Sequence, residues 1–146
     1  MDKKKQGLET LELWQKAMDY AVEDCLNFLP YLPAEEKWAL NSQLRKSVQS
    51  IPANIAEGYG RYSFQETIHF CYIARGSMAK TKTFLILAHR LGYVDDKTSH
   101  IFLARLTELG KMLNGYINHL RNQKSINVLR EDEEDLTYDV SSDSNT

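Results

Sequence analysis

The sequence predicts an all-α protein, an antiparallel up-down-up-down bundle of four helices. Apolar residues recur at steps of three and four in four stretches of the chain, which is the period of an amphipathic helix. Proline, glycine or a capping residue separates each stretch from the next. Connections of about two to six residues place successive long helices side by side in opposite directions. With 146 residues, of which 42% are hydrophobic, the chain is long enough for one such domain.

The first two helices are predicted on either side of a proline-rich turn. Over residues 8–29 one apolar stripe consists of Leu11, Trp14, Met18, Ala21, Val22, Cys25 and Leu29. Pro30 helps to end the first helix. Pro33 and the acids after it favour the start of a second helix. The apolar face of the second helix carries Trp38, Leu44, Val48, Ile51 and Ile55. We expect this helix to stop at Gly58 and Gly60, because glycine takes the left-handed conformation readily.

Pro52 lies inside the second helix and predicts a kink there. A proline in a helix interior costs roughly 3 kcal/mol, because it lacks the N–H donor and its ring crowds the preceding turn. We expect Asn54 to hydrogen-bond the freed carbonyl or a neighbouring helix. Glu57 is placed to pair with Arg61 four residues on, or with Arg75 on the next helix. The alternative is that Asn54, Glu57 and Arg61 form a ligand or RNA site.

The third and fourth helices have clear start signals. Ser63 and Glu66 form a capping box, and Gly92 ends the helix that follows them. Asp95 or Asp96 caps the fourth helix. Apolar residues recur along this helix at steps of four and three, namely Phe102, Leu106, Leu109, Leu113, Tyr116 and Leu120. A second apolar line, which either faces another subunit or widens the core face, comprises Ile101, Leu103, Met112 and Ile117.

The charge is unevenly distributed along the chain. Residues 131–146 contain seven acids and no lysine or arginine, which leaves 18 bases against 13 acids, a net charge of +5, on residues 1–130. A polar, acidic segment cannot bury enough apolar surface to offset its ordering entropy. We therefore predict a flexible N-terminus over residues 1–7, the bundle over 8–124 and a disordered acidic tail over 125–146. The tail either shields the basic body from polyanions or only solvates it.

Few motifs point to catalysis or to a cofactor. A di-metal centre in a bundle needs Glu-x-x-His on two helices, and only Glu66 with His69 has that spacing. Ser77 after Gly76 allows a nucleophile, but a small pair in mid-helix favours close helix approach. We expect no enzyme activity, no metal and no cofactor.

The sequence also gives an expectation about location. It contains neither an apolar run long enough to span a membrane nor a secretory signal at its start. We expect a cytoplasmic protein without membrane contact. In that compartment Cys25 and Cys71, which lie on apolar helix faces, are predicted to be reduced core residues.

The middle of the chain is predicted to carry a binding surface. Residues 45–90 contain seven bases and two acids, a net charge of +5. A basic surface neutralises phosphates and releases counterions, which gives affinity for nucleic acid. The candidate binding residues are Arg45, Lys46, Arg61, Arg75, Lys80 and Lys82. The alternative is an ordinary solvated face, because Lys80 and Lys82 lie about 200° apart around a helix.

Five segments carry a resemblance to a known family: LWQKA at 13–17, QLRK at 43–46, SIPANIAEG at 50–58, IARGS at 73–77 and LGY at 91–93. They are similar to the small four-helix-bundle proteins encoded in intervening sequences of bacterial 23S ribosomal RNA genes, over residues 8–120. This resemblance implies a homopentameric ring and no known catalytic residues. It also implies structural roles for Pro52, Asn54, Glu57, Gly58, Gly76 and Ser77.

More distantly, the chain resembles the accessory variability determinant of diversity-generating retroelements, a basic pentamer that binds nucleic acid and works with a reverse transcriptase. Lys80 and Lys82 stand where the first family usually carries glutamates, which moves the chain toward these relatives. The acidic tail is not part of the family pattern. We therefore predict a non-enzymatic, oligomeric accessory protein that binds RNA or DNA beside a reverse transcriptase. The alternatives are a protein-interaction scaffold without nucleic acid and, third, a metal enzyme.

Overall fold

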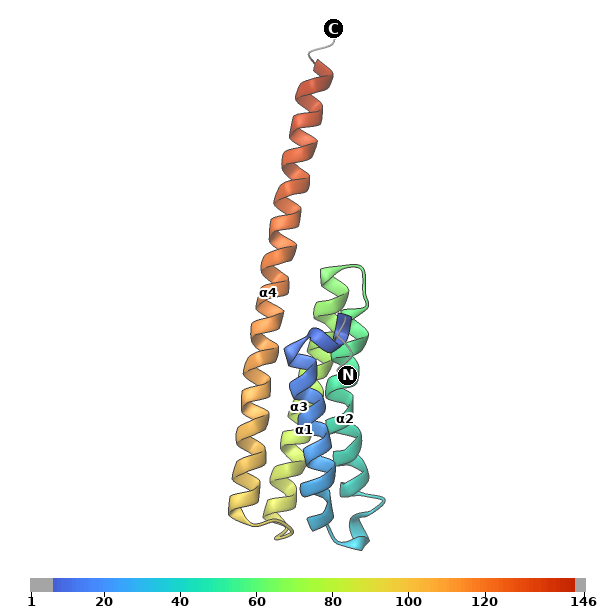
Figure 1. Cartoon of the computed structure of the whole chain (residues 1–146), viewed down its shortest axis with the longest axis vertical. Helices are drawn as coiled ribbons and strands as arrows, with labels where there is room; N and C mark the ends of the chain where they lie inside the picture. Colours follow the sequence, from blue (N-terminus) through green and yellow to red (C-terminus); the bar gives the residue numbers. More distant parts are fainter. Residues whose placement is uncertain (1–6, 144–146) are drawn as a thin grey trace, which may run out of the picture.

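The structure is a computed structural model that describes residues 7–143, with side chains over residues 7–136. Four α-helices, three short 3-10 turns and no strand occur in this part of the chain. The helices are α1 (Glu12–Asn27), α2 (Leu40–Tyr59), α3 (Phe64–Arg90) and α4 (Asp96–Asp143), and the 3-10 turns are Gly7–Thr10, Leu29–Tyr31 and Ala34–Glu36. Successive helices run in opposite directions (Figure 1), which confirms the predicted four-helix bundle.

All four helices bury one face in a shared core. The largest completely buried apolar side chains are Phe28, Leu44, Ile51, Ile55, Leu85, Leu113 and Ile117. The rings of Tyr20 and Phe28 pack edge-on against Phe102, with centroid distances of 6.2 and 5.1 Å. The Tyr20 hydroxyl also donates to the backbone carbonyl of Phe102 over 3.0 Å. These contacts fix α1 against α4.

The second apolar line of α4 belongs mainly to this core. Ile117 is almost completely buried, and Leu103 and Met112 are half-buried against the core. Of the two alternatives that the sequence left open, the structure therefore favours a broad core face for these residues.

The start of the second helix differs from the prediction. Residues 34–36 form a separate 3-10 turn, and α2 begins only at Leu40. The Leu40 N–H donates to the Glu36 carboxylate over 3.0 Å, and Ala39 between them has a non-helical backbone with φ −116° and ψ −105°. The Glu36 side chain thus supplies an acceptor that a continuous helix would have taken from its own backbone. Trp38, predicted on the apolar face, lies between this turn and α2 and is 85% exposed.

The glycines at the end of α2 have a different role from the predicted one. Gly58 is helical and buried, and Gly60 has φ −82°, so neither takes the left-handed conformation. A Cβ atom on Gly58 would lie 2.8 Å from the Cβ atom of Phe70, inside any real contact distance. Gly58 therefore allows α3 to approach α2 closely. Gly92, with φ 79°, does end α3 in the predicted way.

A row of hydroxyl groups joins α2 to α3. Ser50 Oγ and Ser77 Oγ are 2.8 Å apart, and Thr81 Oγ1 donates to Ser47 Oγ over 2.9 Å. Asn54 Nδ2 donates to the carbonyl and the hydroxyl of Ser50, rather than to the carbonyl that Pro52 leaves free. α2 continues through Pro52 as one helix. Buried hydroxyls that satisfy one another set the register of the two helices.

Gly76 does not provide the close approach that the sequence suggested. It lies on the exposed side of α3, and a Cβ atom there would meet nothing within 4 Å. Its neighbour Ser77 is buried against Ser50 and holds the helix pair together. The pair Gly76-Ser77 therefore faces two environments, and only Ser77 contributes to the packing of α2 on α3.

The predicted caps of α3 and α4 are present. The Ser63 side chain accepts from the Glu66 N–H over 3.1 Å, as the first half of a capping box. Asp95 Oδ1 accepts from the Thr98 N–H over 2.7 Å, and this hydrogen bond is the main reason that the pKa of Asp95 lies below its ordinary value. Asp95 rather than Asp96 is thus the N-cap of α4.

α4 extends far beyond the other three helices (Figure 1). The sequence predicted disorder from residue 125, but the structure has helix without interruption to Asp143. Residues 121–136 are almost all exposed, so this part of the helix depends on its own backbone hydrogen bonds and not on packing against the bundle. Despite this length, no helix over the described residues combines the size and hydropathy needed to cross a membrane. We call residues 125–136 the α4 extension.

Candidate nucleic-acid interface

The six bases predicted to bind nucleic acid are all exposed, but they lie on several faces of the bundle. Arg45 and Lys46 are on α2, and Arg45 lines a groove between α1 and α2. Arg61 and Arg75 each lie over an aromatic ring of α3. Lys80 and Lys82 are further along α3, on different sides of it. The structure thus brings only Arg61 and Arg75 together with aromatic side chains.

Tyr72 of α3 lies between two guanidinium groups. Arg75 Cζ is 4.8 Å from the centroid of the Tyr72 ring, and Arg121 Cζ, from α4, is 5.5 Å from it. Arg121 also donates to the Tyr72 hydroxyl, and Arg75 donates to Asn114 Oδ1 over 3.4 Å. These contacts hold two positive groups in fixed positions at the seam between α3 and α4.

A basic cleft opens beside Tyr72, between α3 and the outer part of α4. Its volume is about 820 Å³, and its lining consists of Gln65, Ile68, His69, Tyr72, Arg121, Lys124, Ser125, Val128 and Leu129. Among these described residues there are two permanent positive charges and no carboxylate. We call this cavity the α3–α4 cleft.

The surface continues from the α3–α4 cleft toward the turn between α2 and α3. Gln65 and His69 also line a second cavity of about 610 Å³, together with Arg61 and Phe70. Arg61 Cζ lies 4.9 Å from the centroid of the Phe70 ring, and its Nη2 is 2.5 Å from Glu57 Oε1. The predicted pairing of Glu57 with Arg61 is therefore confirmed, and it orients one base at the edge of this surface.

The arrangement suits a phosphate chain with exposed bases. Guanidinium groups offer several N–H donors to phosphate oxygens, and aromatic rings offer faces on which bases stack. The three residues proposed as an alternative ligand site do not converge in this way. Asn54 is turned toward Ser50, whereas Glu57 and Arg61 pair with each other at the exposed end of α2.

Arg121 and Lys124 were not among the residues selected from the sequence. A signal was present, because Arg121 directly follows Leu120, the last residue of the α4 seam, and a long side chain there borders the helix that packs against it. The excess of positive charge along the sequence lies over residues 45–90, in the two middle helices, and so does not include Arg121 and Lys124. The cleft is formed between helices that are distant in sequence, which a count along the chain does not detect.

Among the described residues, one carboxyl group is buried in the core, that of Asp24 on α1. Its side chain is completely buried, and neither oxygen has a hydrogen-bond partner among the described residues. Burial raises the pKa of Asp24 to about 7. Burial, with Asp24 nearby, also raises the pKa of the Tyr20 hydroxyl far above its ordinary value. This group faces the core, so it is a determinant of stability rather than part of the α3–α4 cleft.

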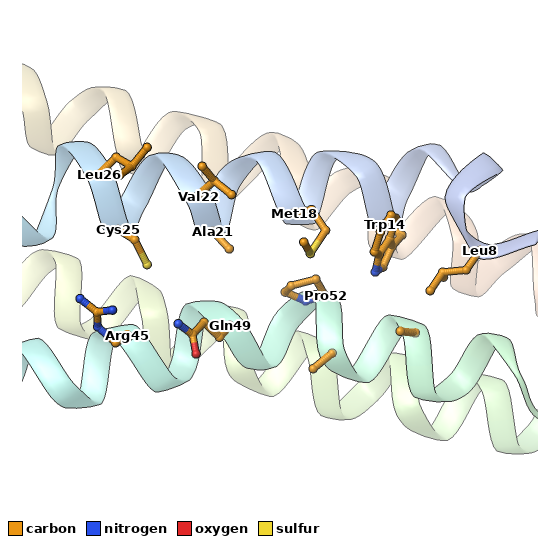
Figure 2. A pocket seen from close by; sticks show the side chains of 12 residues that line it. Leu8, Trp14, Met18, Ala21, Val22, Cys25, Leu26, Arg45, Gln49 and Pro52 are labelled. Carbon is orange, nitrogen blue, oxygen red and sulfur yellow. The ribbon is translucent and has the colours of Figure 1, made fainter. Parts of the chain in front are cut away.

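An apolar groove runs between α1 and α2 (Figure 2). Its volume is about 560 Å³, and its floor includes Pro52 and Ala53. The sequence predicted Met18 and Val22 in the core, but both are exposed along this groove, Val22 to 52%. Cys25 is only partly buried and lines the groove as well, whereas Cys71 is buried as predicted, and both thiols are free. The apolar stripe of α1 is thus wider than the bundle core requires.

The chain matches the family model of the 23S rRNA-intervening sequence protein over residues 9–115, which is more than two thirds of its length. The chain belongs to this family. This member of the 23S rRNA-intervening sequence proteins is also similar to a crystal structure of a protein of unknown function from the S23 ribosomal protein family of Bacteroides thetaiotaomicron. The TM-score is 0.66 and the sequence identity is 27%, over 72% of this chain and 97% of that chain. No protein of curated function matches the chain.

The family match covers most of the bundle but not the outer part of α4. The predicted resemblance to the 23S rRNA-intervening sequence proteins is confirmed, and it covers α1, α2, α3 and the first part of α4. Arg121, Lys124 and the whole α4 extension lie outside residues 9–115. Half of the α3–α4 cleft is therefore built by residues that the family match does not include.

Proposed function

We propose that this 23S rRNA-intervening sequence protein is a non-enzymatic, oligomeric accessory protein that binds RNA or DNA in the α3–α4 cleft. The observation that carries the proposal is Tyr72 held between Arg75 and Arg121, at the edge of a cleft whose described lining has no carboxylate. Arg61 over Phe70 extends this surface. Fixed guanidinium groups beside aromatic rings are the chemistry of sequence-tolerant binding to single strands.

Self-association of the protein rests on two grounds. The resemblance to its family implies a homopentameric ring, and the exposed apolar side chains of α1 provide a surface that water alone covers poorly. The partner we propose for such a particle is a reverse transcriptase of a diversity-generating retroelement, on the ground of the more distant resemblance. Co-purification of the two proteins in the presence of template RNA tests that partnership.

The nucleic-acid proposal is tested by fluorescence anisotropy with labelled single-stranded RNA and DNA over a series of salt concentrations. Binding should weaken steeply with salt, because each phosphate contact to a single strand contributes about −0.7 to the slope of log K against log salt. Arg121→Ala should reduce that slope by about one such contact. Tyr72→Ala should weaken binding at every salt concentration by removing a stacking surface.

The matched control is Lys111→Ala, which removes one positive charge from an exposed position of α4 outside the cleft. It should leave the affinity nearly unchanged. A shortened chain that lacks residues 131–146 should still bind, since the cleft lining ends before them. If neither the full chain nor the shortened one binds RNA or DNA at low salt, the proposal is wrong.

A second candidate function is a protein-interaction scaffold without nucleic acid. The apolar groove between α1 and α2 favours it, because a groove with one charged lining residue, Arg45, suits a protein partner better than a phosphate chain. A partner that co-purifies stoichiometrically after nuclease treatment, and that Val22→Glu releases, would support this function over nucleic-acid binding.

A further inference from the structure

The apolar groove between α1 and α2 has the dimensions of a binding site for one helix. On α1 its wall is formed at steps of four, three and four by Trp14, Met18, Ala21 and Cys25. Figure 2 shows Arg45 and Gln49 at the end of the groove where Cys25 lies. At about 1.5 Å per residue, the wall from Trp14 to Cys25 is about 16 Å long. This is about three turns of a helix.

The α4 extension has an apolar strip of similar length that the described residues of its own chain leave largely exposed. Leu129 and Leu136 are 63% and 66% exposed, and Ile126 is 46% exposed. Positions 126, 129, 133 and 136 follow steps of three, four and three, which places them on one face of the helix. From Ile126 to Leu136 this strip spans about 15 Å. The third of its four positions is an acid, Glu133.

We propose that the α4 extension of one copy of the protein binds in the α1–α2 groove of a second copy. The extension cannot reach the groove of its own chain, because α4 is one continuous helix that leads away from the bundle (Figure 1). Two helices whose apolar residues alternate in steps of three and four interlock along such a seam.

The charges fix the direction of the bound helix. Glu133 is the charged member of the strip, Arg45 is the charged residue of the groove, and neither makes an ion pair within the described residues of one chain. When Glu133 lies beside Arg45, Leu129 and Ile126 extend toward Met18 and Trp14. The extension then runs antiparallel to the α4 of the chain that it contacts.

The same pairing brings Glu133 close to Cys25, because Cys25 and Arg45 lie at the same end of the groove. This gives a direct test with the full chain. In Glu133→Cys, mild oxidation should link the introduced thiol at position 133 of one copy to Cys25 of another, since a disulfide requires Cα atoms within roughly 7 Å. Cys71 does not compete, because it is buried and burial raises the pKa of its thiol to about 11.

The matched control is Glu131→Cys, the same chemical change two residues away and about 160° around the helix. We expect at least about fivefold more of the link to Cys25 from position 133 than from position 131, because only one of the two faces meets the geometric requirement. A mixture of isotopically labelled and unlabelled chains, digested and analysed by mass spectrometry, identifies links between copies. Equal yields from the two variants would overturn the proposal, as would links confined to single chains.

A charge exchange tests the same contact without cysteine chemistry. Arg45→Glu should raise the dissociation constant for self-association, measured by sedimentation velocity, by about tenfold, because two carboxylates would then face each other. Arg45→Glu combined with Glu133→Lys should restore the original value, whereas Arg45→Glu with Glu131→Lys should not. If the chain self-associates equally well without residues 125–146, another part of a neighbouring copy covers the groove and the extension does not bind there. Nucleic-acid affinity is measured separately, so either proposal can fail alone.

Discussion

Asp24 gives the strongest prediction about stability. Its carboxyl group is completely buried in the core without a hydrogen-bond partner in the described part of the chain, and burial raises its pKa to about 7. The ordinary value, 3.8, applies in the unfolded chain. Between these two values the folded protein holds a proton that the unfolded protein releases. The free energy of unfolding must therefore fall as the pH rises through this window.

The magnitude follows from the same two values. Each pKa unit corresponds to about 1.4 kcal/mol, so a difference of about three units costs about 4 kcal/mol once the pH is well above 7. Part of this cost is already present at pH 5, because the unfolded carboxyl is ionised there. Between pH 5 and pH 8 the expected loss from Asp24 alone is about 2 to 3 kcal/mol. Domains of this size have about 5 to 15 kcal/mol in total, so the loss is readily measured.

The variant Asp24→Asn removes the titration while keeping the size and shape of the side chain. We expect urea denaturation at pH 5, 6, 7 and 8 to show the unfolding free energy of the wild type falling by about 2 to 3 kcal/mol more than that of Asp24→Asn, which is the linkage of one group. The comparison uses the change with pH, because a buried amide also has unsatisfied hydrogen-bonding groups. Asp19→Asn, on the exposed side of α1, is the control and should follow the wild type. Parallel curves for the wild type and Asp24→Asn would refute the reasoning.

Three further predictions concern the helix contacts. Gly58→Ala should destabilise the fold by about 1 to 3 kcal/mol in urea denaturation, because its Cβ atom would lie 2.8 Å from that of Phe70. Gly76→Ala, where a Cβ atom meets open space, should stabilise the fold by up to about 1 kcal/mol. Equal effects of the two substitutions would contradict the different roles assigned to the two glycines. Thr81→Val should cost about 1 to 2 kcal/mol in the same assay, because it leaves the buried Ser47 hydroxyl without its donor, and a neutral result would mean that these hydroxyls do not fix the helix pair. Deletion of residues 125–146 should leave the melting temperature of the monomeric bundle within a few degrees of the full chain, because the described side chains of this segment, over residues 125–136, are all exposed. A large loss would show that the extension supports the core.

The sequence was sufficient for features that depend on near neighbours. Ser63 and Asp95 cap α3 and α4, and Gly92 ends α3, because each interaction involves residues within one turn of the helix. The same local rules failed where a distant residue decides. Gly58 is in a position that suits a helix end, but its partly buried neighbour Phe70 comes from the next helix.

The α1 stripe shows a second limit of prediction from sequence. Met18 and Val22 have the spacing of core residues, and periodicity cannot show which apolar side chains find a partner within the same chain. The structure leaves them exposed along a groove. An apolar stripe that is wider than the bundle can cover predicts an interface as well as a core. Only the packing of α2 against α1 shows which residues of the stripe belong to the core and which to the interface.

The residues that pack α2 against α3 and the residues proposed to function lie in different places, for a physical reason. Ser50, Gly58 and Ser77 hold α2 against α3, and Asn54 holds Ser50 in place. Such packing restricts each position to very few side chains. Exposed interfaces impose weaker restrictions, so they vary without loss of the fold. The α3–α4 cleft and the α4 extension use residues beyond 115, where the family match ends. A chain with the same packed signature but without Arg121, Lys124 and Glu133 should therefore fold in the same way, yet lack both the nucleic-acid site and the contact between copies.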